Sequence, residues 1–186
     1  MIHRSDISII SVNGKMPKID DSAFIAPGCR IVGDVTIGPQ TSIWYNCVIR
    51  AEVNSVVIGA RSNIQDGSVI HCDGPMPGVP GGYPTIIGDD VLVGHNVMLH
   101  GAILHDHAFV GLSATVMNGA VIEGDAMLAA GAMLTQGKQI PARQLWAGAP
   151  ARFVRNLDEE AVMGMRMSVA HYVENAKMHM AAIAAA

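Results

Sequence analysis

The sequence predicts an all-β solenoid followed by a C-terminal α-helix. An aliphatic residue recurs about every six positions from residue 19 to residue 140, and a small or β-branched residue usually stands two positions before it. This period fits neither the two-residue alternation of an ordinary strand nor the 3.6-residue turn of a helix. It is typical of hexapeptide repeats stacked as a parallel β-helix, in which three repeats close a triangular coil of about 18 residues. The low aromatic content, 4%, agrees with a core built from small, regular layers.

The predicted order of elements follows from where this period begins and ends. Residues 1–18 are expected to be an extended lead-in, residues 19–155 the β-helix, and residues 156–186 a helix packed on the solenoid. The aliphatic anchors, which should point into the coil, are Ile19, Ile25, Ile31, Ile37, Ile43, Ile49, Ile58, Ile64, Ile70, Ile87, Val93, Leu99, Leu104, Val110, Val116, Ile122, Leu128, Leu134 and Ile140.

The period is interrupted in three places. Three extra residues follow Ile49, eleven follow Ile70, and one is missing after Leu99, counted against the six-residue spacing. The longest insertion contains the Pro/Gly-rich segment CDGPMPGVPGGYPT. Such interruptions usually form loops on one face of a solenoid, often the functional face.

The end of the chain predicts the helix. A helix is expected from about residue 158 to residue 180, with an apolar stripe along it. Asn156 or Asp158 can cap its N-terminus, and acidic residues follow in the first turn. The terminal segment AAIAAA is expected to be frayed or disordered.

Composition excludes several classes of partner. The net charge is −4 and no basic run occurs, so a nucleic-acid partner is not expected. No apolar stretch of about 20 residues could span a bilayer. Three cysteines and an N-terminus without an apolar signal region favour a soluble, cytoplasmic protein.

Three histidines fall at related positions when the anchors are counted coil by coil. Ile70 and Leu99 should lie in one column, so His71 and His100, which follow them, should stack about 4.8 Å apart. By the same count, His95 should stack on Asp66 at another corner. A threefold assembly would bring His95 of one chain to the pair of the next. Three histidines and an open position form a catalytic zinc site.

Three motifs strengthen this interpretation. They are Arg50-Ala51-Glu52, the segment from Gln65-Asp66-Gly67 to His71, and Gly94-His95 followed by His100. Together with the hexapeptide repeats they resemble the gamma-class carbonic anhydrase family over about residues 19–155. The resemblance implies a left-handed coil and a homotrimer with a metal ion at each interface. The metal would be Zn²⁺, with Fe²⁺ or Co²⁺ as alternatives, and the reaction would convert CO₂ to bicarbonate.

The resemblance also implies roles for further residues. Gln65 looks like the residue that orients the metal-bound hydroxide or the CO₂. Arg50 and Asp66 look like an ion pair across the subunit interface, with Glu52 nearby. The insertion contains no glutamate, so Asp73 or Tyr83 in it, or His171 or Tyr172 on the predicted helix, are the candidates for moving protons.

Three other functions remain open. Hexapeptide repeats also occur in acyltransferases, which need one catalytic histidine rather than a stacked pair and a third. A relative of the same family could hydrolyse a thioester. A metal-binding subunit with little catalysis is the last alternative.

Overall fold

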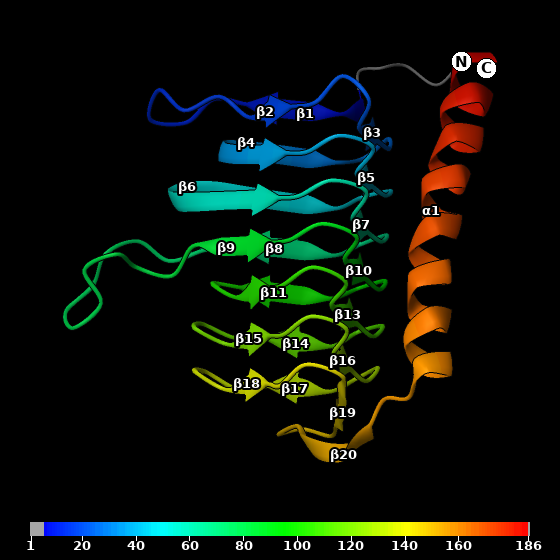
Figure 1. Ribbon diagram of the computed structural model, residues 1–186. Coiled ribbons are helices and arrows are strands. Elements are labelled where there is room, and N and C mark those ends of the chain that lie inside the picture. The colour runs from blue at the N-terminus through cyan, green and yellow to red at the C-terminus, as the bar shows by residue number, and fades with distance from the viewer. Residues whose placement is uncertain (1–5, 186) are drawn as a thin grey trace.

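The protein is a parallel β-helix with one long helix along its side (Figure 1). The computed structural model describes residues 6–185. Residues 1–5 of the predicted lead-in, and residue 186, lie outside this range. In Figure 1 the coils are stacked from the N-terminal end downwards, and the chain then returns along them as α1. The predicted fold class, a solenoid of hexapeptide repeats with a C-terminal helix, is confirmed.

Short strands form the three faces of the solenoid. The first face contains the start of β6 (Val48–Ile58), then β8 (Val69–His71), β11 (Met98–His100), β14 (Thr115–Val116) and β17 (Met133–Leu134). The second contains the end of β6, then β9 (Thr85–Ile87), β12 (Ile103–Leu104), β15 (Val121–Ile122) and β18 (Gln139–Ile140). The third contains β3 (Phe24–Ile25), β5 (Ser42–Ile43), β7 (Asn63–Ile64), β10 (Leu92–Val93), β13 (Phe109–Val110), β16 (Met127–Leu128) and β19 (Gln144–Ala147).

The first and last coils are closed by additional strands. β4 (Arg30–Ile37) runs across two faces beside β6, and both β1 (Ser8–Ile10) and β2 (Lys18–Ile19) pair with it in parallel. Part of the expected lead-in therefore joins the sheet. At the other end β20 (Arg152–Asn156) pairs with β19 in antiparallel fashion, which ends the parallel stack.

The pairing register shows that the expected columns exist. Ile70 lies beside Ile49 on one side and Leu99 on the other. These anchors are fully buried, in agreement with a core stacked from one aliphatic layer per coil. The insertions therefore leave the columns intact, and the side chains beyond the anchors keep the register that the sequence predicts.

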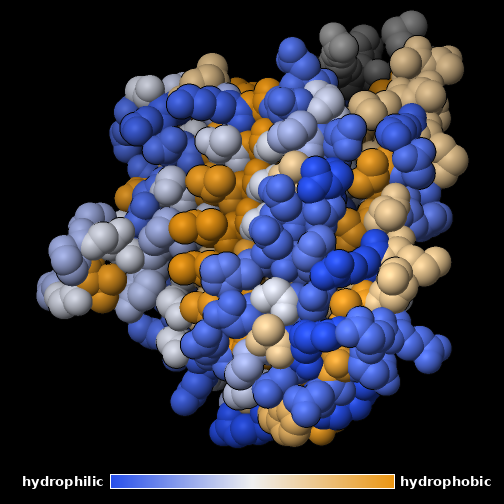
Figure 2. All heavy atoms as spheres, in the orientation of Figure 1, coloured by the Kyte–Doolittle hydropathy of each residue, from blue (hydrophilic) through white to orange (hydrophobic). Residues whose placement is uncertain are grey.

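Hydrophobic side chains also line the outside of the second face. Val57, Ile86, Ile103 and Val121 stand beside one another in successive coils. Figure 2 shows a hydrophobic column down the middle of this view, over the face that contains β6, β9 and β15, with polar side chains on both sides. In-register stacking of β-branched side chains stabilises the ladder between coils.

The helix α1 (Glu159–Ala185) packs against β3, β5 and β7. Asp158 caps it, because its Oδ1 accepts a hydrogen bond from the Ala161 backbone N–H at 2.9 Å. The expectation that the helix ends near residue 180 and that AAIAAA frays is wrong for residues 181–185, which are helical. Ile183 packs against the core, and His179 contacts Tyr45 at 2.8 Å, so tertiary contacts hold this end. Within the described residues, no helix is both long and apolar enough for a membrane span.

Candidate metal centre

His71 and His100 lie one above the other where the first face of the solenoid ends. They are direct partners in the register between β8 and β11. Because Ile70 and Leu99 before them point into the core, the two imidazoles project at the corner. Their ring centroids are 5.0 Å apart, and His71 Nδ1 is 3.0 Å from His100 Nε2. The stacking predicted from the anchor count is therefore present.

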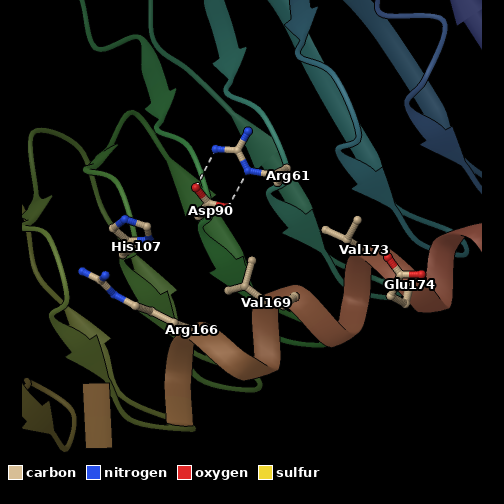
Figure 3. A pocket seen from close by; sticks show the side chains of 8 residues that line it. Arg61, Asp90, His107, Arg166, Val169, Val173 and Glu174 are labelled. Carbon is tan, nitrogen blue, oxygen red and sulfur yellow. Dashed lines mark hydrogen bonds and ion pairs between the residues drawn. The ribbon is translucent and has the colours of Figure 1, made fainter. Parts of the chain in front are cut away.

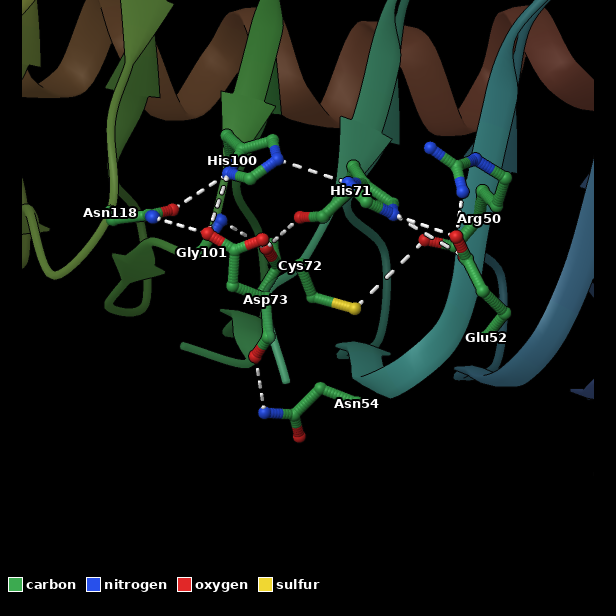
Figure 4. A network of polar contacts seen from close by, with 10 residues as sticks. Arg50, Glu52, Asn54, His71, Cys72, Asp73, His100, Gly101 and Asn118 are labelled. Atoms are coloured by element: carbon green, nitrogen blue, oxygen red, sulfur yellow. Dashed lines mark hydrogen bonds and ion pairs between the residues drawn. The ribbon is translucent and has the colours of Figure 1, made fainter. Parts of the chain in front are cut away.

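Four side chains form a row at this place, which we call the histidine corner: Glu52, His71, His100 and Asn118 (Figure 4). The Glu52 carboxylate is 3.2 Å from His71 Nε2, and Asn118 Oδ1 is 2.7 Å from His100 Nδ1. Arg50 forms an ion pair with Glu52 from the other side. The row thus has a hydrogen-bond acceptor at each end and two imidazoles between them.

The three contacts in this row cannot all be hydrogen bonds, because one hydrogen is missing. The row contains three contacts, each of which needs one hydrogen, whereas two neutral imidazoles carry only two. When both hydrogens point to the acceptors at the ends, His71 Nδ1 and His100 Nε2 face each other with lone pairs. A third proton is disfavoured, because burial, followed by the charges of Arg50 and His100, lowers the pKa of His71.

A metal ion between the two lone pairs would resolve this deficit. Tetrahedral zinc with bonds of about 2.0–2.1 Å holds two nitrogen ligands about 3.3 Å apart, close to the observed 3.0 Å. The outer nitrogens would then donate to Glu52 and Asn118, as metal-bound histidines commonly donate to a carboxylate or carbonyl oxygen. The side chains at the histidine corner therefore fit a metal ion as two of its ligands.

His95 stands at a different corner of the same chain. Its Nδ1 is 2.8 Å from Asp66 Oδ2, so the predicted stacking of these two residues is present. His95 lies in the turn before β11, whereas His100 is the last residue of β11, so the two histidines stand at opposite ends of this strand. Across residues 6–185, no group of three or more metal-ligating side chains occurs. The single chain thus offers two ligands at one corner and one at another, and the three-histidine site stays a prediction.

Gln65 is buried next to His95. It is 3% exposed, and its Nε2 donates to Asn63 Oδ1 at 3.0 Å. Asn63 is fully buried, and its Nδ2 has no hydrogen-bond partner among residues 6–185. An open cavity of about 370 Å³ reaches this place, lined by Gln65, His95, Leu112 and Tyr172 among others. Gln65 and His95, which sequence reasoning selected separately, therefore share one cavity with Tyr172.

The remaining predicted residues take different partners within one chain. Arg50 pairs with Glu52 rather than with Asp66, which pairs with His95; an Arg50–Asp66 pair between subunits stays a prediction. Tyr172 packs edge-on against Trp44, with the ring centroids 5.4 Å apart. Burial, and then the nearby Asp66 charge, raise the pKa of Tyr172, which makes it a poor proton acceptor near neutral pH.

Sequence reasoning missed two residues that complete these contacts. Asn118 lies one coil beyond His100, but one residue is missing after Leu99, so the anchor count places Met117 rather than Asn118 beside His100. Asn63, the first residue of β7, precedes Gln65 by two residues and could have been found from that spacing.

A second cluster of charged side chains lies under α1, away from the histidine corner (Figure 3). This arginine cluster contains Arg61, Asp90 and Arg166, which line an open cavity of about 270 Å³, and Asp125, which binds Arg166. Arg61 binds Asp90 at 2.8 and 2.7 Å, and Arg166 binds Asp125 at 3.0 and 2.9 Å. The Arg61 guanidinium lowers the pKa of Asp90. Each guanidinium is already bound to a carboxylate, so the cluster fastens coils and helix together rather than offering a free charge.

The chain is similar to known proteins over nearly its whole length. Residues 16–51 match the family described as bacterial transferase hexapeptide (six repeats). The mitochondrial gamma carbonic anhydrase 1 of Arabidopsis thaliana is 42% identical over 94% of this chain, which spans 63% of that protein. A carbonic anhydrase of Geobacillus kaustophilus is 42% identical over 93% of this chain and 91% of its own length. The crystal structure of a hexapeptide transferase family protein from Anaplasma phagocytophilum superposes with a TM-score of 0.85, at 39% identity, over 91% of this chain and 96% of that one.

Proposed function

Because the chain belongs to the gamma-class carbonic anhydrase family, we propose that it catalyses the reversible hydration of CO₂ to bicarbonate at a metal site shared between subunits. His71 and His100 of one chain and His95 of its neighbour would hold the ion. The observation that carries the proposal is the histidine corner, where two partly buried ring nitrogens face each other while the outer nitrogens of both rings face hydrogen-bond acceptors.

Zn²⁺ is the expected ion, and Fe²⁺ or Co²⁺ would suit the same imidazole nitrogens. When bound, such an ion lowers the pKa of a water ligand to about 7, so that a hydroxide nucleophile is available at neutral pH. The other roles belong to the protein. Glu52 and Asn118 fix the outer nitrogens of His71 and His100. Gln65, whose amide is oriented by Asn63, would direct its polar atoms at CO₂ or at the nucleophile.

A homotrimer is the assembly that this site requires. The histidine corner and His95 occupy the two edges of the first face, so three copies arranged around an axis would bring unlike edges together. Exposed apolar side chains accompany both edges: Met98 and Met117 stand next to His100, and Leu112 stands one coil from His95. Each edge also borders a cavity, of about 360 Å³ beside His100 and about 370 Å³ beside His95. Joined at the interface, they would enclose one largely apolar space for CO₂.

The same side chains limit the alternatives. An acyltransferase using one histidine would not need His71 and His100 in contact. Hydrolysis of a thioester, or metal binding with little catalysis, would use the same metal ligands. These two alternatives differ from the proposed function only in which reaction, if any, the bound metal catalyses. A cytoplasmic location stays a prediction that rests on three free cysteines.

Metal analysis together with a CO₂-hydration assay tests the proposal. We expect about one metal ion per chain and hydration activity that disappears after chelation and returns with zinc. Metal without hydration, but with thioester cleavage, would replace the proposed reaction by the hydrolase. Metal with neither activity would leave a metal-binding subunit. Acyl-CoA binding by a metal-free protein would favour the acyltransferase.

A further inference from the structure

The insertion between β8 and β9 is a hairpin with its base at the histidine corner. Asp73 and Tyr83 exchange backbone hydrogen bonds of 3.0 and 2.8 Å, and Met76 and Val79 do the same near the tip at 3.1 and 2.9 Å. In Figure 1 this hairpin projects sideways from the solenoid. Its base therefore starts two residues after His71, whereas its tip lies away from the coils.

Asn54 and Gly101 hold the base of the hairpin against the coils. The Asn54 Nδ2 group donates to the backbone oxygens of Asp73 at 2.8 Å and of Gly81 at 2.9 Å. Gly101 has a φ of 59°, and a Cβ built there would approach Tyr83 Cβ to 2.5 Å. Only a glycine lets the base pack this closely. The position of Asp73 is thus fixed from two sides.

The side chain of Asp73 fixes the orientation of Asn118. Asn118 Nδ2 donates to Asp73 Oδ2 at 2.6 Å, and Asn118 Oδ1 is 2.7 Å from His100 Nδ1 (Figure 4). A carboxylate only accepts hydrogen bonds, so the amide nitrogen must face Asp73 and the amide oxygen must face His100. The oxygen in turn requires a hydrogen on Nδ1, which leaves the lone pair of His100 on Nε2, the nitrogen that faces His71.

We propose that Asp73 and Asn118 are positioning residues that select the tautomer of His100 and thereby present its Nε2 to the metal. Asn54 supports them by holding the hairpin base. The Pro/Gly hairpin thus acts on the metal centre through two hydrogen bonds, although it contributes no ligand. The proposal deepens the proposed function, because it takes His100 to be a metal ligand.

The tautomer can be measured directly in the zinc-free, full-length protein. Long-range ¹H–¹⁵N NMR spectra, recorded at a pH where His100 is neutral, distinguish hydrogen on Nδ1 from hydrogen on Nε2. We expect Nδ1–H in the wild type and a mixture of both forms in Asn118→Leu and in the isosteric Asp73→Asn. Met76→Ala, at the hairpin tip, is the matched control and should behave as the wild type.

Zinc affinity gives the second readout. Competition with a chelating indicator should show a loss of about tenfold to a hundredfold in Asn118→Leu, as for other groups that orient metal ligands. Because Asp73 acts through Asn118, the double variant Asp73→Asn/Asn118→Leu should lose no more affinity than Asn118→Leu alone. Asn54→Ala should show a smaller loss in the same direction.

The two readouts separate this proposal from the proposed function. An unchanged Nδ1–H tautomer in both Asn118→Leu and Asp73→Asn would overturn the positioning role, even if activity fell. Additive losses of zinc affinity would overturn the path from Asp73 through Asn118. A wild-type protein that binds zinc but does not hydrate CO₂ would contradict the proposed function, while the tautomer shift in the variants would still support the positioning role.

Discussion

The histidine corner and the arginine cluster both consist of nitrogen-containing side chains beside oxygen acceptors, but only in the arginine cluster does every contact have its own hydrogen. In the arginine cluster each guanidinium meets a carboxylate with two hydrogen bonds. In the histidine corner three contacts share two hydrogens, and two lone pairs are directed at one another. A high density of charged groups therefore does not by itself identify a metal site. Ring nitrogens whose lone pairs have no hydrogen-bond donor are the better indication.

Replacing a histidine at the histidine corner should have the largest effect. With His100→Ala, only His71 remains there as a ligand, and we expect zinc content to fall from about one per chain to below about a tenth of that, with loss of CO₂ hydration. The matched change in the arginine cluster, Arg61→Ala, should leave both unchanged. Elemental analysis and a hydration assay make the comparison. Equal effects of the two variants would contradict the distinction between the two regions.

Removing the Gln65 amide should have an intermediate effect. Gln65→Leu deletes a polar group that Asn63 orients beside His95. We expect kcat to fall by roughly tenfold to a hundredfold while zinc content stays unchanged, because Gln65 directs the reactants rather than binding the metal. Gln139→Ala, which removes an exposed amide bonded to Glu123, is the control. Loss of zinc in Gln65→Leu would show that this residue serves the metal centre instead.

Breaking an ion pair in the arginine cluster should have the smallest effect. Asp90→Asn should lower the free energy of unfolding by no more than about 1 kcal/mol, because Arg61 and Asp90 are both partly exposed to solvent. CO₂ hydration should stay at the wild-type level.

The pH dependence of that small effect has a definite sign. Arg61 lowers the pKa of Asp90 in the folded state below its ordinary value of about 3.9. The stabilisation is therefore fully present above the unfolded pKa and disappears as the pH falls through the folded pKa. Denaturant titrations of wild type and Asp90→Asn should differ at neutral pH and converge as the pH falls through the folded-state pKa of Asp90. A difference that grew towards acid would contradict the pairing.

Much of the fold and part of the site follow from the spacing of anchors. The count by coils placed His71 beside His100 and Asp66 beside His95, because in-register parallel strands carry sequence spacing directly into space. It did not identify Asn118 or the role of the hairpin base. Those depend on how an insertion folds back, and a Pro/Gly-rich segment has no period from which this could be inferred. It also ended the helix too early, since the contact of His179 with Tyr45 is tertiary.

The central claim is that one metal site uses ligands from two chains, and mixing two inactive variants tests it most directly. His71→Ala and His95→Ala homotrimers should each lack a complete site. In trimers assembled at random from equal amounts of both, a site is complete when an intact His71 meets an intact His95, which happens at about one quarter of the interfaces. We predict that zinc binding and CO₂ hydration return to about that fraction of the wild type. Mixed trimers that recover neither would contradict a shared site.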